Sequence, residues 1–232
     1  MSSKKIIILT GFLFLTATAQ SQVLITLVFG DKLNAPGLEF GLETGANWST
    51  NRGFESNNML GTFNLGFYFD IRLKNQWYLY TGVMAKSSLG VDKLTQSDLE
   101  FLGTPLYEEE GDYRQQFSNF LLPVLGKFKF KNHFFVEAGF MAGWLRDAYV
   151  EFRVDGEDRK ARIQDYNRDL FNRIDAGISG GFGYTLLKGT GISIGVNYYY
   201  GLVNAIKETT GSGNNSIFLK VNIPVGAAKK EE

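Results

Sequence analysis

Side chains that could carry out catalysis are sparse in this chain of 232 residues, which has one histidine, His133, and no cysteine. A serine or cysteine nucleophile needs a neighbouring base with a pKa near neutrality, and that base is usually histidine. His133 lies in the polar stretch 131–133, which reads as a tight turn. A site built from carboxylates alone stays open, although no pair of acidic residues singles one out. We therefore predict no enzymatic activity, no catalytic residue and no cofactor.

Two further stretches could bind ions. The acidic run 108–110 with Asp112 offers the clustered carboxylates that calcium prefers, but its spacing matches no calcium-loop geometry. The glycines at 180, 181 and 183 are not followed by a helix, whose N-terminus would be needed to bind a phosphate. We interpret the first stretch as a solvated run of charges. We interpret the glycines of the second as small residues that relieve crowding inside the fold, and we predict no metal site.

The charged residues are balanced, with 24 Lys and Arg against 24 Asp and Glu. Nucleic-acid binding requires a basic surface, so no nucleic-acid partner is expected. The charges within apolar stretches fall mostly at alternate positions. In 117–144, for example, Phe120, Val124 and Phe128 share one parity, whereas Lys127 and Lys129 share the other. This period of two predicts strands with one apolar and one polar face.

The same period recurs along the chain and predicts eight strands. They cover about 38–48, 60–73, 77–87, 117–130, 134–144, 169–186, 192–202 and 217–223. The connections after strands two, four and six are short, and the others are long. This rhythm is typical of bacterial outer-membrane barrels. We predict an all-β fold, an eight-stranded antiparallel up-and-down transmembrane β-barrel with short periplasmic turns and long extracellular loops.

A soluble, lipocalin-like periplasmic binding barrel is the alternative, because its strands also alternate, with the apolar side inward. Lipid contact is favoured by apolar stripes of about ten residues and by an interfacial aromatic girdle, Trp48, Trp77 and Trp144, at strand ends. The polar face then lines the lumen, where charges must pair. The predicted lumen charge network comprises Glu39, Glu43, Asp70, Arg72, Lys86, Lys127, Lys129, Glu137, Arg173, Asp175 and Lys220.

Two irregularities are expected. Pro123 has no N–H to donate, so it predicts a bulge or a skipped bond in its strand. Beyond Trp144 a weak alternation continues through Val150, Phe152 and Val154 to Asp155-Gly156, a hairpin dipeptide. We interpret this segment as a ribbon that projects beyond the bilayer.

The N-terminus has the features of a cleaved export signal: basic residues, a short apolar core and small residues near position 19. The predicted organisation is a signal peptide at 1–21, a periplasmic segment at 22–37, the barrel at 38–225 and a tail at 226–232. Whether the segment at 22–37 plugs the lumen stays open. Outer-membrane lipid is the expected partner.

The segment Asn119-Phe-Leu-Leu-Pro123, followed by Phe134-Phe-Val-Glu-Ala-Gly139, resembles the PorT-like outer-membrane β-barrel family of Bacteroidetes. Asp175-Ala-Gly and Tyr200-Gly-Leu202 also match. The resemblance covers about 38–225 and implies an eight-stranded barrel, in a family whose namesake serves a secretion and gliding apparatus. The chain departs from many outer-membrane proteins in lacking an aromatic residue at the end of its last strand.

From these observations we expect a structural, assembly or secretion-associated protein of the outer membrane without an open pore. Residues 88–112 and 146–168 are its expected contacts with other cell-envelope proteins. A narrow pore or small-solute transporter that uses the charged lumen is the second alternative, beside the soluble barrel.

Overall fold

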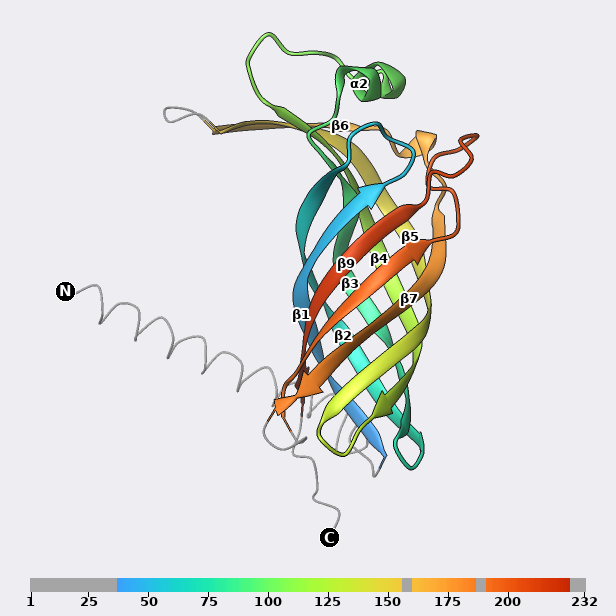
Figure 1. Cartoon of the computed structure of the whole chain (residues 1–232). Coiled ribbons are helices and arrows are strands. Elements are labelled where there is room, and N and C mark those ends of the chain that lie inside the picture. The colour runs from blue at the N-terminus through green and yellow to red at the C-terminus, as the bar shows by residue number, and fades with distance from the viewer. Residues whose placement is uncertain (1–36, 156–159, 187–190, 226–232) are drawn as a thin grey trace, which may run out of the picture.

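The computed structural model describes residues 37–155, 160–186 and 191–225. This part of the chain forms one antiparallel sheet, in which eight strands tilt around a common axis (Figure 1). The strands are β1 (Leu38–Asn51), β2 (Asn58–Lys74), β3 (Trp77–Asp92), β4 (Asp112–Lys129), β5 (Phe134–Asp155), β6 (Lys160–Tyr166), β7 (Ile174–Thr185), β8 (Ser193–Gly201) and β9 (Asn214–Pro224).

The ring runs β1-β2-β3-β4-β5-β7-β8-β9 and closes where β9 pairs with β1, so that Trp48 lies opposite Ile217. Every neighbouring pair in it is antiparallel. Strand β6 lies outside the ring and pairs with the outer part of β5. The predicted eight-stranded up-and-down barrel is thus confirmed. Among the described residues, no helix is long and apolar enough to cross a bilayer.

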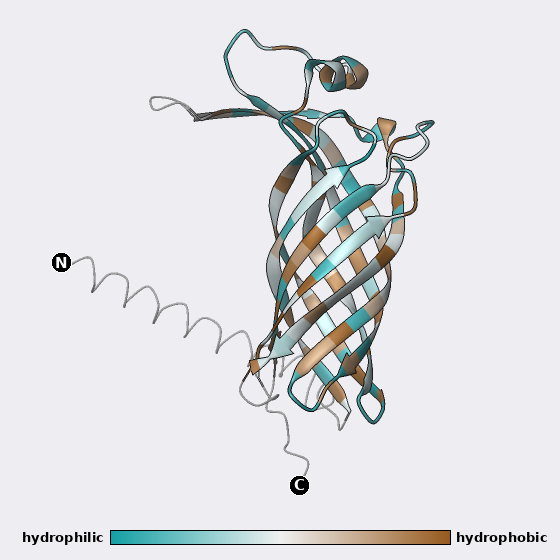
Figure 2. Cartoon of the chain, viewed as in Figure 1, coloured by the Kyte–Doolittle hydropathy of each residue, from teal (hydrophilic) through white to brown (hydrophobic). Residues whose placement is uncertain are grey.

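The alternating apolar residues point away from the barrel axis. Phe140 and Phe182 are 68% and 60% exposed, whereas their chain neighbours Met141 and Gly183 are buried. Figure 2 shows brown and teal residues mixed along the strands, as expected where apolar side chains alternate with small and polar ones. A soluble barrel would turn the apolar set inward. The soluble alternative is therefore wrong.

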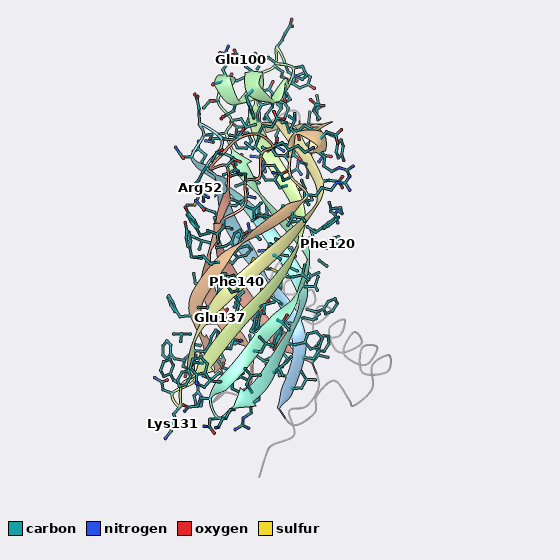
Figure 3. All side chains as sticks on the ribbon, turned by 90° about the vertical axis from the view of Figure 1, so that its right-hand side faces the viewer. Arg52, Glu100, Phe120, Lys131, Glu137 and Phe140 are labelled. Carbon is teal, nitrogen blue, oxygen red and sulfur yellow. The ribbon has the colours of Figure 1, made fainter. Side chains whose placement is uncertain are left out.

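The two ends of the barrel differ. Short turns connect β2 to β3 and β4 to β5 at one end, and Figure 3 shows Lys131 at that end and Glu100 at the other. Long connections and the β5–β6 ribbon lie at the second end (Figure 1). By the pattern of outer-membrane barrels, the short turns are periplasmic and the long connections extracellular.

Residues 88–112, at the extracellular end, contain more regular structure than the sequence pattern predicts. Strand β3 continues to Asp92, and a short helix, α2 (Gln96–Leu102), follows. Thr95 caps the helix by accepting a hydrogen bond from the Asp98 N–H, and Gly103 ends it in the left-handed conformation with φ of 66°. The predicted ribbon is confirmed, because β5 reaches Asp155 and pairs with β6. A 3₁₀ turn, η2 (Arg168–Leu170), leads from β6 towards β7.

Pro123 interrupts the ladder as predicted. Between β3 and β4 the pairing jumps from Thr81–Val124 to Met84–Leu121, so Pro123 has no ladder partner in β3. On its other side Pro123 stays in register with Met141 of β5. The strand therefore skips pairing on the side where the proline would have to donate.

Candidate functional site

The inner, periplasmic half of the lumen holds a buried network of charges. Lys127 Nζ lies 2.9 Å and 3.0 Å from the two carboxylate oxygens of Asp70 and 3.5 Å from Glu137 Oε2. Lys129 Nζ is 2.8 Å from Asp70, and Lys220 contacts Glu137. These residues come from four strands, β2, β4, β5 and β9, so the network joins the ring across its interior.

Aromatic rings complete this inner layer. Lys127 Nζ lies 4.2 Å from the centre of the Tyr80 ring and 4.6 Å from that of Phe135, and Lys220 Nζ lies 3.9 Å from the Tyr80 ring. The faces of these rings attract cations, an interaction that strengthens where water is excluded. The Tyr80 hydroxyl donates to Glu43, and Asn197 Nδ2 donates to Glu137 at 2.7 Å. The lysines are therefore held by carboxylates and rings together.

An apolar cluster occupies the outer half of the lumen. Its inward side chains come from β3, β4, β5, β8 and β9, and others come from α2 and the loops. It contains Phe54, Met84, Leu89, Val91, Leu94, Leu99, Leu102, Phe117, Leu121, Met141, Leu145, Ala148, Val150, Phe171, Tyr199, Ile206 and Phe218. Because eight strands enclose a space that side chains can fill, the cluster closes the barrel at this level.

Polar side chains line the remaining walls of the outer half. The Tyr199 hydroxyl and Asn214 Nδ2 each donate to Asp175 at 2.9 Å. Asn51 Nδ2 donates to Asn214 Oδ1 at 2.7 Å. Asn47 Nδ2 donates to the Ser88 carbonyl at 3.0 Å. These bonds link strands within the wall and satisfy polar groups that burial would otherwise penalise.

The extracellular connections form a platform over this apolar cluster. Leu99 and Leu102 of α2 belong to the cluster, as does Phe54 of the β1–β2 loop. Asp98 ties the two segments together, because its carboxylate accepts from the N–H groups of Glu55 at 2.8 Å and Ser56 at 3.1 Å. The platform is thus anchored in the interior of the barrel.

A second contact attaches the platform to the ribbon. The Tyr107 ring stacks on Phe152 at 4.8 Å between ring centres, and Tyr113 lies 4.7 Å from the same ring. The Tyr113 hydroxyl also accepts a hydrogen bond from the Tyr107 N–H at 2.8 Å. The acidic run that follows Tyr107 is exposed. No group of acidic or histidine residues suited to a metal ion occurs in the described part of the chain.

The structure gathers most of the predicted lumen charges but not all of them. Seven belong to the inner layer or adjoin it, and an eighth, Asp175, lies in the outer half: Glu39, Glu43, Asp70, Lys127, Lys129, Glu137, Lys220 and Asp175. Glu39 accepts from the Tyr68 hydroxyl at 2.8 Å. Arg72 is exposed beside the periplasmic turn, where its Nε donates to the Asn75 carbonyl, and Arg173 is exposed just before β7.

Lys86 corrects the predicted network. A bulge in β3 makes Ala85 and Lys86 consecutive exposed residues, and the register with both neighbouring strands shifts there. The bulge reverses the parity assumed from unbroken alternation, so Lys86 lies on the outer wall. Its Nζ is 5.7 Å from the centre of the outward Phe63 ring.

The three tryptophans all lie on the outer surface. Trp48 is 41% exposed, Trp77 54% and Trp144 50%. Trp77 stands at the periplasmic end beside Phe128, with 5.0 Å between ring centres. His133 lies in the β4–β5 turn, as expected, where its ring faces that of Tyr184 edge-on.

Sequence reasoning missed the apolar half of the lumen and the aromatic lining of the charged half. One signal was present: the stretch Phe120-Leu-Leu-Pro-Val-Leu125 is apolar at both parities, so its inward positions cannot belong to a polar lumen. Leu121 and Leu125 are indeed each 1% exposed on the inside.

Comparison with known proteins relates the chain to outer-membrane β-barrels. The sequence profile of the family described as outer membrane protein beta-barrel domain matches residues 19–207. No curated protein matches the chain. Among solved structures, Ail, the attachment invasion locus protein of Yersinia pestis, is 11% identical, with 81% of this chain and 98% of that chain covered and a TM-score of 0.44.

Two further structures have similar statistics. Neisserial surface protein A is 9% identical, with 82% and 96% covered and a TM-score of 0.40. OprG of Pseudomonas aeruginosa is 14% identical, with 81% and 91% covered and a TM-score of 0.33. These three similarities carry no inference about the role of the chain. The family match spans most of its length, and the chain belongs to the outer membrane protein beta-barrel domain family as an integral protein of the outer membrane.

Proposed function

We propose that this protein is a closed structural barrel that presents its extracellular platform to other cell-envelope proteins, in an assembly or secretion-associated role. The single observation that carries the proposal is the close packing of side chains in the lumen. Leu89 and Val91 in the outer layer are 0% exposed, and Lys127 in the inner layer is 1% exposed. Side chains that line a water-filled channel would retain accessible surface, so an open pore does not fit this interior.

The platform supplies the contact surface. Phe101 of α2 is 53% exposed, Leu106 60% and Tyr166 of the ribbon 64%. These residues lie beyond the barrel wall, where lipid would not cover them. Large apolar side chains gathered outside a membrane wall are typical of protein contact sites. These exposed apolar side chains fall within 88–112 and 146–168, the two segments that we propose as contacts with other cell-envelope proteins.

The resemblance to PorT-like barrels of Bacteroidetes supports a secretion-associated assembly as the setting. Such a role needs a stable anchor and a specific extracellular surface rather than a conducting lumen. The alternative, a narrow pore for small solutes, uses the same charged residues but requires the apolar layer to open.

Conductance separates the two roles. We expect the purified full chain to give no steady current in planar bilayers. A variant that combines Val91→Ser, Phe117→Ser and Leu121→Ser removes apolar bulk from the closing layer, and we expect it to conduct. A steady current through the unaltered chain that is reduced by Lys127→Gln would overturn the proposal in favour of the pore.

Site-specific photocrosslinking in cells tests the platform. A benzophenone amino acid at position 106 or 166 should give an adduct with a protein of defined mass, whereas the same group at Phe140, on the lipid-facing wall, should not. The variant Asp98→Ala, which frees α2 from the β1–β2 loop, should weaken the adduct from position 106. Equal adducts from the platform and the wall would refute a contact role.

A further inference from the structure

Two β-bulges lie beside exposed basic side chains on the outer wall, and the one in β3 turns Lys86 outward. In β3, Met84 and Ser87 are buried, whereas both Ala85 and Lys86 between them are exposed. In β5, Leu145 and Ala148 are buried, and Arg146 is exposed between them. The register with β4 shifts by one residue at both places. A bulge places one additional residue on one face of a strand. In β3 that residue is the cation Lys86, whereas in β5 it is Asp147, because Arg146 already shares the outward parity of Trp144.

The two bulges lie at the same level of the barrel. Phe120 of β4 pairs with Trp144 of β5, and on its other side it faces the β3 bulge. Figure 3 shows Phe120 at the outer edge of the wall. Arg146 lies over this ring, with Cζ 5.7 Å from its centre. Because neighbouring strands are about 4.8 Å apart, the backbones at Lys86 and Arg146 are roughly 10 Å apart.

A third cation adjoins them at the start of β7. The Arg173 carbonyl accepts a hydrogen bond from the Leu145 N–H at 2.8 Å, which places exposed Arg173 next to Arg146 on the neighbouring strand. The facing carboxylate is Asp147, whose Oδ2 is 3.7 Å from Arg146 Nε in an exposed pair. Arg168 also donates from Nη1 to the Arg146 carbonyl at 3.3 Å. In the part of the chain that the structure describes, Lys86 and Arg173 have no carboxylate partner.

These cations stand at the outer limit of the apolar wall. Towards the periplasm, the outward positions on β4 are Leu122 and Val124, both exposed. Towards the outside, the next outward positions are Ser88 and Gln116, whose side chains hydrogen bond to each other at 3.1 Å. On β3 and β4 the wall therefore changes from apolar to polar at the level of Lys86.

The height of the wall agrees with this boundary. Trp77, at the periplasmic end of β3, lies nine residues before Lys86. Nine residues rise about 30 Å along a strand, and a tilt of 35–45° reduces this to roughly 21–25 Å along the barrel axis. The apolar band of an outer-membrane barrel is about 25 Å tall. Lys86 and its neighbours thus lie where the headgroups of the outer leaflet begin.

We propose that Lys86, Arg146 and Arg173 form a binding site for the phosphate headgroup of an outer-leaflet lipid. Guanidinium groups pair with phosphate oxygens through two parallel N–H bonds, and a lysine ammonium adds a point charge. The acyl chains of the same lipid lie against the adjoining wall at Leu122 and Phe140. A lipid suits the site because the three cations adjoin an apolar wall. The acyl chains of a lipid would cover that wall, whereas a free anion would not.

The test measures lipid association next to Trp144, which borders the site. The protein is a single-tryptophan variant, Trp48→Phe with Trp77→Phe, reconstituted in phosphatidylcholine vesicles. Brominated phosphatidylglycerol or brominated phosphatidylcholine is added at increasing mole fraction, and quenching of Trp144 is recorded. We expect half-maximal quenching at a clearly lower fraction of the anionic lipid. Each basic residue near an anionic headgroup raises the affinity for the lipid about fivefold, so three together give at most about a hundredfold preference for the anionic lipid.

The triple variant Lys86→Gln, Arg146→Gln, Arg173→Gln should lose this preference while its quenching by brominated phosphatidylcholine stays unchanged, which shows that the barrel is folded. The matched control neutralises Lys74, Lys131 and Arg162, three exposed basic residues away from the site, and should retain the preference. Equal quenching by both lipids, or equal loss in the control, would refute the site. Displacement of the anionic lipid by millimolar inorganic phosphate would refute a lipid occupant and indicate a free-anion site.

Discussion

Removing Lys127 should destabilise the barrel more than removing any neighbouring lysine of the network. Its ammonium group lies between two buried carboxylates, 2.9 Å from Asp70 and 3.5 Å from Glu137, and all three side chains are at most 3% exposed. Taking one partner from a buried ion pair costs about 3–5 kcal/mol, because the charge left behind stays unpaired.

The structure sets the expected value within that range. After Lys127→Met, Asp70 keeps Lys129 at 2.8 Å and Glu137 keeps Lys220, so neither carboxylate is left without a cation. We therefore expect a loss of about 3 kcal/mol, at the lower end of the range. Lys129→Met should cost about 1 kcal/mol or less, because the Lys129 side chain is 27% exposed and solvent screens its pair.

The measurement is reversible urea unfolding in lipid vesicles, followed by tryptophan fluorescence. A double-mutant cycle with Asp70→Asn should show a coupling energy of about 1–3 kcal/mol between Asp70 and Lys127. The double variant should therefore lose less unfolding free energy than the two single variants lose together. Equal losses for Lys127→Met and Lys129→Met, or an additive cycle, would refute the assignment of Lys127 as the centre of the network.

Three further predictions use the same unfolding assay or a protease. Phe140→Arg puts a charge on the middle of the lipid-facing wall and should cost about 2–4 kcal/mol, whereas Lys131→Arg in a periplasmic turn should cost nothing measurable. Gly183→Val should cost about 1–3 kcal/mol because a Cβ there meets the Phe135 ring and the Ile194 carbonyl, whereas Gly126→Ala, whose Cβ would have its nearest neighbour at 3.7 Å, should be tolerated. Asp98→Ala should accelerate protease cleavage within 93–111 without moving the unfolding midpoint, because Asp98 holds the β1–β2 loop. Glu100→Ala should leave the cleavage rate unchanged, because Glu100 is exposed. Unchanged cleavage in Asp98→Ala would refute that anchoring role.

The barrel could be predicted from the sequence because lipid and lumen impose opposite chemistry on alternate residues. Over most of each strand one rule therefore fixes which face each side chain occupies. In β5, for example, Val136 and Phe140 point outward, and Glu137 and Met141 point inward. The rule holds only while the pleat is unbroken. The β3 bulge shifts the parity at Lys86, and no residue in that stretch marks it as a glycine or proline would.

Helix α2 shows the opposite case, in which a local signal existed but the periodicity did not suggest it. Thr95 and Asp98 form a capping box and Gly103 supplies the left-handed end, and both features can be seen in the sequence. The helix has 7 residues, too few to establish a 3.6-residue period, so periodicity alone predicts a loop there. Its stability depends on Leu99 and Leu102, whose partners come from distant strands.

The division of the lumen into two layers suits the proposed function, in which one small domain combines a stable anchor with an extracellular contact surface. The charged layer joins β2, β4, β5 and β9 near the periplasm, where an apolar filling could not satisfy the lysines and carboxylates. The apolar layer extends upward without a break from Leu121 in the wall to Leu99 in α2. The platform is therefore packed on the barrel core rather than tethered by flexible loops. A partner that binds Phe101 or Leu106 would contact a surface fixed relative to the membrane, and this is the property that an assembly anchor needs and a gated pore, whose closing layer must move, does not have.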